Sequence, residues 1–146
     1  NMMKILKTFT LLVFLSFLLS CEKDDKKKMD ILEINSETIV DSEIYENSEG
    51  LRIKTEPKIV ADILVVTITT SGCDGSIWKA QLIDKNVLAY SDPVQRFAKI
   101  KFENLEDCRA VISKTFTFDL KPLRIKSGNK VIINLDGWDK SLLYVY

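Results

Sequence analysis

Along most of the chain, apolar and polar residues alternate with a period of two. Trp78, Ala80 and Leu82 share one parity, and Lys79 and Gln81 occupy the positions between them. Because successive side chains of a β-strand point to opposite faces of its sheet, this pattern predicts strands with one buried face. From residue 31 onward, no stretch keeps the period of an amphipathic helix. The same alternation recurs in three further stretches, residues 98–102, residues 112–118 with Lys114 as a polar interruption, and residues 131–135.

Short polar clusters divide this pattern into many strands. β-Branched and aromatic residues, which favour strands, dominate the apolar positions from residue 31 onward. Strands with one solvated face belong mainly to antiparallel sheets. We therefore predict an all-β fold, an antiparallel two-sheet sandwich that resembles the immunoglobulin-like class. The predicted strands are residues 31–34, 38–45, 51–55, 59–70, 76–83, 87–90, 94–102, 110–120, 123–125, 130–135 and 141–146.

Proline and glycine positions refine these predicted strands. Proline cannot donate a hydrogen bond to a ladder, so Pro57, Pro93 and Pro122 should lie at strand starts or on edges. Asp136-Gly137 is a tight-turn sequence and predicts a hairpin between the last two strands. The last strand should then be part of the core.

The beginning of the chain has a different pattern. Lys4 and Lys7 precede an apolar stretch, residues 9–19, and Ser20 provides a small residue before Cys21. This layout is typical of an export signal. As a helix, the apolar stretch would measure roughly 16 Å, about half of the hydrocarbon thickness that a membrane-spanning helix must cross. A permanent transmembrane helix is therefore the less favoured alternative.

The junction Leu18-Leu19-Ser20-Cys21 resembles the bacterial lipobox. The resemblance implies that residues 1–20 are a lipoprotein signal peptide, removed at Cys21, and that Cys21 becomes the lipidated first residue of the mature protein. A cysteine suits this role because its thiolate is a good nucleophile. Two or three acyl chains, palmitate among them, anchor a protein stably, whereas one chain does not. An ordinary signal peptide that ends beside a cysteine is the alternative.

The residues after Cys21 resemble the surface-export tag of Bacteroidota lipoproteins, in which a cysteine and any residue are followed by a lysine and two acidic residues. Lys23, Asp24 and Asp25 fill these positions. The resemblance implies an outer-membrane lipoprotein at the cell surface. A periplasm-facing position in the outer membrane is the alternative, and Glu22 leaves retention at the inner membrane open.

Residues 21–30 form a predicted tether that begins with the lipidated cysteine. Eight of the nine residues from 22 to 30 are charged. Such a segment cannot bury enough apolar surface to offset the loss of conformational entropy on folding. We predict that the tether is disordered and that residues 31–146 form a single β-sandwich domain.

Composition limits the chemistry that this domain can perform. The chain contains no histidine, which removes histidine-dependent triads, most mixed zinc sites and the usual pH switch. Without residues 1–20, which carry two lysines and no acids, 19 basic and 21 acidic residues remain. This balance gives no electrostatic reason to expect nucleic-acid binding. We predict no catalytic residues, no metal site and no cofactor, and therefore a protein that is not an enzyme.

Cys73 and Cys108 are the two cysteines that remain after the anchor. Export would place them in an oxidising compartment, where a cysteine pair normally forms a disulfide. If residues 87–102 form one interrupted strand, both cysteines reach the same end of the sandwich; if a full hairpin closes at residues 91–93, they reach opposite ends. Free buried thiols and a reactive or metal-binding thiol are the alternatives to the predicted disulfide.

Loop carboxylates and tryptophans are the other candidates for binding. Asp74 and Asp107 would be neighbours at the disulfide end, which makes them the one pair to consider for an ion, although aspartates in loops are more simply turn residues. Trp78 lies on an alternating strand face and is predicted to be in the core. Trp138, in the sequence Asp-Gly-Trp-Asp, either folds back over the core or is exposed as a contact residue.

The folded part also resembles, at a few positions, small uncharacterised Bacteroidota lipoproteins with a two-cysteine β domain. This resemblance implies no activity. The positions are Ser71-Gly72-Cys73, Asp107-Cys108 and Phe118-Asp119-Leu120.

These patterns predict an outer-membrane-anchored, surface-exposed lipoprotein that acts as a non-enzymatic binding or accessory module. The alternative is a periplasm-facing structural or assembly lipoprotein that docks a membrane-protein partner. The predicted partners are the membrane, through the lipid anchor, and an envelope protein or an extracellular ligand.

Overall fold

The computed structural model describes residues 32–146, which form one compact unit. The predicted signal peptide, the lipidation site Cys21, the export-tag residues Lys23, Asp24 and Asp25, and the tether lie outside the described residues. The elements are β1 (Glu37–Val40), α2 (Ser42–Glu46), β2 (Lys58–Val60), β3 (Ile63–Gly72), β4 (Lys79–Asp84), β5 (Gln95–Glu103), β6 (Ala110–Asp119), the 3-10 helix η2 (Lys121–Leu123), β7 (Lys130–Leu135) and β8 (Leu142–Val145).

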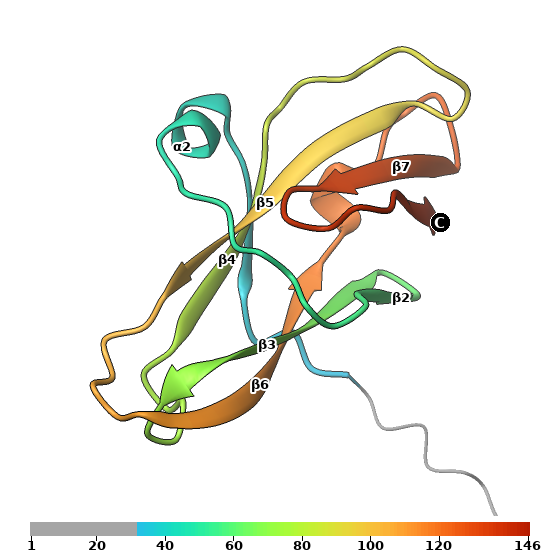
Figure 1. Ribbon diagram of the computed structural model, residues 1–146. Helices are drawn as coiled ribbons and strands as arrows, with labels where there is room; N and C mark the ends of the chain where they lie inside the picture. Colours follow the sequence, from blue (N-terminus) through green and yellow to red (C-terminus); the bar gives the residue numbers. More distant parts are fainter. Residues whose placement is uncertain (1–31) are drawn as a thin grey trace, which may run out of the picture. The chain divides into compact units, whose positions relative to one another are not determined.

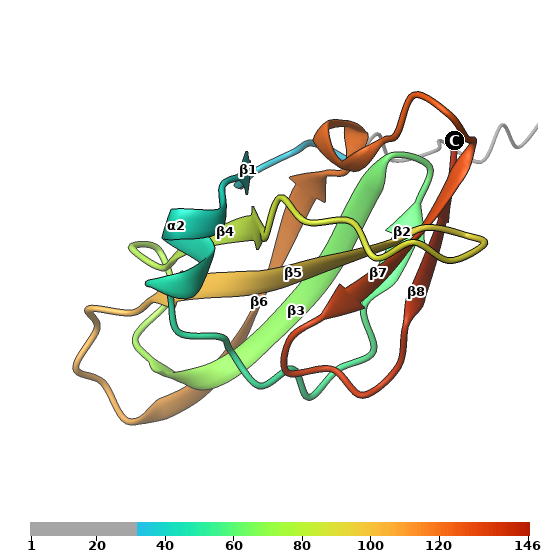
Figure 2. The same cartoon turned by 90° about the horizontal axis from the view of Figure 1, so that it is seen from above.

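The strands form two sheets that pack on each other as a β-sandwich (Figure 1). One sheet has the strand order β1-β4-β5-β7-β8, and the other has the order β2-β3-β6. The short helix α2 lies beside β4, as Figure 2 shows. The predictions of an all-β fold and of two sheets are confirmed.

The prediction of purely antiparallel sheets is wrong for two strand pairs. β1 runs parallel to β4, and β5 runs parallel to β7. In both cases the connecting chain passes through the opposite sheet, by way of β2 and β3 in the first pair and of β6 in the second. Alternation along a strand reports which face is buried and says nothing about the direction of the neighbouring strand, so the sequence pattern could not reveal these parallel pairs.

The core lies between the sheets and contains the residues that the alternation assigns to the inner faces. Burial of these side chains is the main stabilising contribution of a fold of this kind. Phe116 and Phe118 of β6 are also buried, whereas Lys114, the polar interruption on the same face, is half-buried. The inner residues of β7 and of the β4 segment are at most 6% exposed: Trp78, Ala80, Leu82, Val131, Ile133 and Leu135.

Several stretches rich in apolar residues are not the strands that the sequence predicts. The stretch 38–45 is a strand only as far as Val40, because Asp41 caps α2 and accepts a hydrogen bond from the Ile44 N–H at 2.8 Å. Pro122 lies in the turn of the 3-10 helix η2, and residues 123–125 form no strand. Residues 32–34, 51–55 and 87–90 contain no strand either. Ile53, Leu51 and Ile125 of these stretches pack on the core without joining a ladder, whereas Ile34 and Val87 are exposed.

The hairpin between β7 and β8 is confirmed at the predicted turn. Gly137 has a φ of +80°, and a Cβ atom there would lie 2.1 Å from the Leu51 carbonyl oxygen. The Gly137 carbonyl accepts a hydrogen bond from the Ile53 N–H at 2.9 Å. The turn therefore holds the irregular segment around Ile53 against the core, and Ile53 is only 6% exposed.

Candidate functional site

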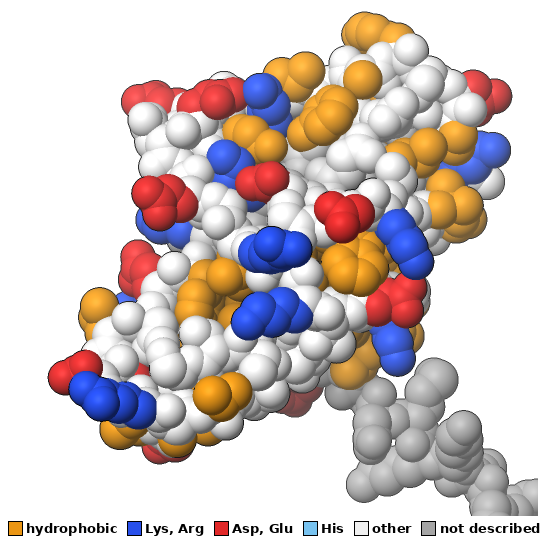
Figure 3. All heavy atoms as spheres, viewed as in Figure 1, with side chains coloured by type: hydrophobic (Ala, Val, Ile, Leu, Met, Phe, Trp, Pro, Cys, Tyr) orange, Lys and Arg blue, Asp and Glu red, His pale blue; other side chains and the backbone are white. Residues whose placement is uncertain are grey.

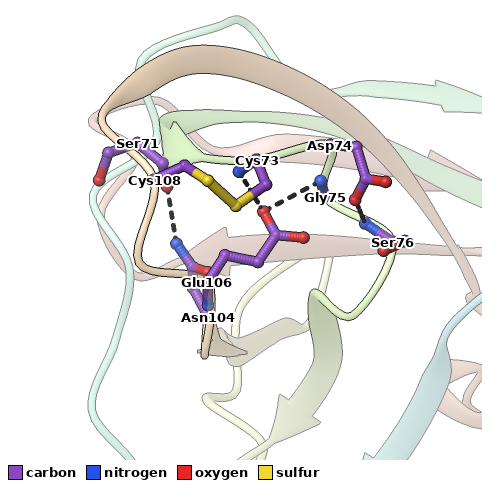
Figure 4. The surroundings of a disulfide bond; sticks show 8 residues. All are labelled: Ser71, Cys73, Asp74, Gly75, Ser76, Asn104, Glu106 and Cys108. Atoms are coloured by element: carbon purple, nitrogen blue, oxygen red, sulfur yellow. Dashed lines mark hydrogen bonds between the residues drawn. A yellow bond between two sulfur atoms is a disulfide. The ribbon is translucent and has the colours of Figure 1, made fainter.

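The disulfide between Cys73 and Cys108 joins the loops after β3 and β5, with Cα atoms 4.9 Å apart (Figure 4). The predicted disulfide is thereby confirmed, and both cysteines are exposed rather than buried. The chain does reverse between Ala89 and Gln95, which pair in an antiparallel bridge. The expectation that a reversal at residues 91–93 sends the cysteines to opposite ends is therefore wrong, because residues 85–90 continue in the direction of β4 and do not form a separate strand. β4 and β5 are consecutive antiparallel strands, and both cysteines reach the same end.

Glu106 braces the loop that carries Cys73 (Figure 4). Its carboxylate accepts hydrogen bonds from the backbone N–H groups of Cys73 at 2.6 Å and Gly75 at 3.1 Å. The Glu106 N–H donates to Asn104 Oδ1, and Asn104 Nδ2 donates to the Ser71 carbonyl. The end of the sandwich is therefore held by side-chain hydrogen bonds as well as by the disulfide.

Asp74 and Asp107 are the two carboxylates that the sequence suggests for binding an ion, and Asp74 has a simpler role at this end. Asp74 Oδ1 accepts a hydrogen bond from the Ser76 N–H at 2.8 Å, as in an ordinary aspartate turn. Hydrogen bonds from Ser76 lower the pKa of Asp74. Among residues 32–146, no three acidic or cysteine side chains are placed to hold a metal ion.

A groove of about 500 Å³ opens between the two sheets where β1 separates from β4. β1 pairs with β4 only from Gln81 onward, so Lys79 and Ala80 have no strand partner on that side. The chain before β1 crosses to the other sheet, where Ser36 forms a bridge with Phe118 of β6. The groove thus lies between the uncovered edge of β4 and the edge of β6.

Aromatic side chains form the floor of this groove. Trp78 and Phe116 line it and are each only 3% exposed. Phe102 packs edge-on between them, with ring-centroid distances of 5.3 Å to Trp78 and 6.2 Å to Phe116. Gly72 lies close against the indole, and a Cβ atom there would be 2.6 Å from Trp78 Cζ2. The floor is therefore closely packed and apolar.

Lys114 places a positive charge at the wall of the groove. It has the parity of Phe116 on β6, and its ammonium lies 5.3 Å from the Phe116 ring centroid. The ammonium donates to the Gly75 carbonyl at 2.7 Å. An ammonium has three donors, so two remain for water or a ligand. The polar interruption in the β6 alternation is thus a feature of the groove.

The rest of the rim carries mixed charge. Gln81 Nε2 donates to Glu37 at 2.8 Å, and Lys101 lies 3.9 Å from Glu103. Lys79 has no ion-pair partner within the described part of the chain. With Lys114 included, three lysines and two glutamates line the groove. The rim is therefore slightly positive.

Asn35 occupies the edge of β6 beside the groove. Its backbone N–H donates to the Thr117 carbonyl, and the Thr117 N–H donates to Asn35 Oδ1 at 2.9 Å. Asn35 Nδ2 donates to the Thr115 carbonyl at 3.2 Å. The side-chain amide thus makes the pair of hydrogen bonds that the backbone of an added strand would make.

A second and shallower hollow, of about 360 Å³, lies at the turn after β7. Tyr45 faces it, with the Lys99 and Lys85 ammonium groups 4.0 and 5.4 Å from its ring centroid. Burial and the nearby carboxylate of Asp136 raise the pKa of Tyr45. Trp138 lines the same hollow, is half-buried and packs against the core. Its use as a contact residue stays a prediction.

The surface is mixed in character. On the face shown in Figure 3, acidic and basic side chains are interspersed with hydrophobic ones, without a broad area of one sign. Tyr90, Leu105 and Val111 are the most exposed large hydrophobic residues among those described, at 92%, 80% and 75%. No helix within residues 32–146 is long and apolar enough to cross a membrane.

Of the polar residues that organise the groove and the disulfide end, the sequence reveals only Lys114. Lys114 gave a signal, because it breaks the alternation of β6. Glu106 is one acid among several in its loop, and Asn35 precedes the first strand without any motif. Their roles depend on chain segments about 30 to 80 positions away along the sequence.

No family model and no curated protein matches the sequence. Two solved structures are similar. One is a protein of unknown function, DUF1344, from Bacteroides vulgatus, with a TM-score of 0.52 and 11% identity; the match covers 76% of this chain and 56% of that chain. The other is a predicted lipoprotein from Bacteroides fragilis, with a TM-score of 0.43, 9% identity and coverage of 76% and 68%.

The first of these matches defines the class of fold. This chain spans little more than half of the length of the Bacteroides vulgatus protein. At that level of identity the likeness concerns the arrangement of the strands and not an activity. The protein is therefore a two-sheet β-sandwich, closed at one end by a disulfide, that shares its fold with that structure.

Proposed function

We propose that this protein is a lipoprotein of a Bacteroidota-like bacterium, anchored in the outer membrane and displayed at the cell surface, whose β-sandwich acts as a non-enzymatic binding or accessory module. The observation that carries the proposal is the sequence of residues 18–25, in which a lipobox-like junction is followed directly by a segment like the surface-export tag. Two or three acyl chains on Cys21 provide the stable membrane anchor.

The described residues support a binding role rather than catalysis. The chain has no histidine to act as a general base. The groove between β4 and β6 combines an apolar floor with a few polar groups, which is the usual composition of a binding site. We also propose that the strand arrangement is a variant of the immunoglobulin-like class, with β1 and β7 in parallel pairings.

Mass spectrometry of the native protein tests the anchor. We expect a mature chain that begins at Cys21 and carries two or three acyl chains. The variant Cys21→Ser should keep its leader, carry no lipid and leave the membrane fraction in part or whole. An uncleaved leader on the wild-type protein, or an unmodified thiol at position 21, would contradict the proposed anchor.

Protease treatment of intact cells tests the orientation. We expect the domain to be degraded in intact cells that express the wild-type protein. The triple variant of the tag, Lys23→Ala with Asp24→Ala and Asp25→Ala, should remain lipidated but become resistant to the protease. Resistance of the wild-type protein, with degradation only after the outer membrane is opened, favours the periplasm-facing structural lipoprotein instead.

A further inference from the structure

We propose that the groove between β4 and β6 binds an extended, acidic peptide segment of another protein, and that this segment adds as a strand to the free edge of β6. The inference rests on the proposed function as a binding module, and it names the site and the class of ligand. It starts from Asn35, because this residue already makes with β6 the hydrogen bonds of an added strand.

Residues 32–146 cover only one end of the β6 edge. The carbonyl of Thr115 and both the N–H and the carbonyl of Thr117 point outward and bond to Asn35. Because residues alternate along a strand, the backbone N–H and C=O groups of Ser113 and Val111 point to the same side. Within residues 32–146, no group forms a hydrogen bond with them outside the ladder to β3. An open edge of this kind is a template for pairing with a further strand.

The groove provides the space that such a strand needs. A peptide that follows β6 from Thr115 toward Val111 continues the path of Asn35 and runs beside the uncovered part of β4. The volume of the groove, about 500 Å³, lies within the usual range for ligand sites. Alternate peptide side chains would pack on the floor formed by Trp78 and Phe116, and the others would face the rim. The ligand should therefore alternate apolar and polar residues.

The charges of the rim favour acidic side chains at the polar positions of the peptide. Of the two glutamates, Glu103 lies near Lys101, and Glu37 accepts from the neutral amide of Gln81 and keeps its charge. Lys79 and Lys114 have no carboxylate partner within the described residues. Opposite charges across an interface raise the association rate and select the partner, and their effect weakens with salt.

The test measures binding of fluorescein-labelled octapeptides to the full chain in detergent micelles by fluorescence anisotropy. The probes are a peptide of alternating valine and glutamate, the same peptide with alternate backbone amides methylated, and a peptide of alternating valine and lysine. We expect saturable binding of the first peptide, weakened by salt. The other two should bind at least about tenfold more weakly, since each lacks either the ladder hydrogen bonds or the matching charge.

Two pairs of protein variants locate the site. Ser113→Pro removes the outward N–H of β6 and should weaken binding about tenfold, whereas Ser113→Ala keeps that N–H and should bind as wild type. Lys79→Glu should weaken binding several-fold, whereas Lys58→Glu makes the same charge change on β2, away from the groove, and should not. Circular dichroism checks that each variant is folded. If Ser113→Pro does not fold, the methylated peptide and the comparison of Lys79→Glu with Lys58→Glu still test the proposed site.

Several outcomes would overturn this inference. These are no saturable binding of the valine-glutamate peptide, equal binding of the methylated peptide, or equal loss in Lys79→Glu and Lys58→Glu. Wild-type dimers that become monomers in Ser113→Pro would identify a second copy of this chain as the occupant instead. The assay uses purified protein, so a negative result would not bear on the proposed lipid anchor or on the surface position. A negative result for the anchor or the surface position in cells would likewise not bear on peptide binding.

Discussion

Arg96 Nη1 donates to Asp84 Oδ1 at 2.7 Å in the interior of the sandwich, where Asp84 is fully buried and Arg96 is 8% exposed. The pair joins β4 to β5 at the end opposite the disulfide. Asp84 Oδ1 also accepts from the Asn86 N–H at 2.9 Å, but Asp84 Oδ2 and Arg96 Nε have no partner among the described residues. Burial raises the pKa of Asp84 despite the opposing guanidinium.

Arg96→Met should therefore destabilise the protein by about 3–5 kcal/mol at pH 7, because it leaves a buried carboxylate without its counter-charge. The double variant Arg96→Met with Asp84→Leu should recover most of this loss, since neither charge then needs solvation. Urea unfolding measures both free energies. Lys85→Met, which breaks the exposed ion pair with Glu46, is the matched control and should change the free energy of unfolding much less.

Arg96→Met should raise the pKa of Asp84 further above its usual value, because the charge and the hydrogen bond of Arg96 oppose the effect of burial in the wild-type protein. A carboxyl group whose folded pKa lies above its unfolded value favours folding most at low pH, and this contribution is lost as the pH rises through the folded pKa. The instability of Arg96→Met relative to wild type should accordingly shrink as the pH falls and Asp84 takes up a proton. Equal destabilisation at pH 4 and pH 7 would show that lost packing, and not the unpaired charge, is the cause.

Tyr144 should make the protein sensitive to alkali. Its hydroxyl donates to Asp62 Oδ1 at 2.6 Å and accepts from Arg124 Nε at 3.0 Å. Burial, followed by the hydrogen bond to Asp62, raises the pKa of Tyr144 from 10.0 to about 12. A raised pKa stabilises the fold below the unfolded value, and this stabilisation is lost as the pH rises through the folded value.

The stability difference between wild type and Tyr144→Phe should therefore be constant up to about pH 10 and shrink between pH 10 and pH 12. At pH 8 we expect the variant to be less stable by roughly 1–2 kcal/mol, the cost of a buried hydrogen bond. Thermal unfolding followed by circular dichroism over this pH range provides the measurement. Tyr90→Phe alters a side chain that is 92% exposed and should show neither effect.

The disulfide should contribute mainly to stability. Cys73 and Cys108 are separated by 35 positions, and closing a loop of that length is worth about 4 kcal/mol in the loop-entropy model. Both residues are exposed, so Cys73→Ser with Cys108→Ser removes little packing. The double variant should lose about that free energy in urea unfolding. A wild-type protein that gains no stability over its reduced form would contradict this expectation.

Sequence patterns reveal much of this fold because the buried face of a strand requires an apolar residue at every second position. The inner faces of β4 and β7 follow directly from the alternation, and the Asp136-Gly137 turn was predictable from its residues. Strand direction and the positions of Asp84 and Arg96 were not, because they depend on which strands become neighbours. Asp84 directly follows the predicted strand 76–83 and has the parity of Leu82, which would place its side chain on the inner face. A charged residue at such a position suggests the end of a strand until its partner on β5 is known.

The loop brace at the disulfide end leads to a last prediction. Glu106 holds the N–H groups of Cys73 and Gly75 with one carboxylate, and a hydrogen bond to a charged group contributes about 1.5–3 kcal/mol. Glu106→Ala should lose stability in that range, whereas Glu106→Gln keeps an acceptor oxygen and should lose less. The exposed neighbour Asp107→Ala serves as control and should change little. Hydrogen exchange at Cys73 and Gly75 gives a local readout: it should accelerate in Glu106→Ala more than in Asp107→Ala. Equal exchange in the two variants would mean that the disulfide alone fixes this loop.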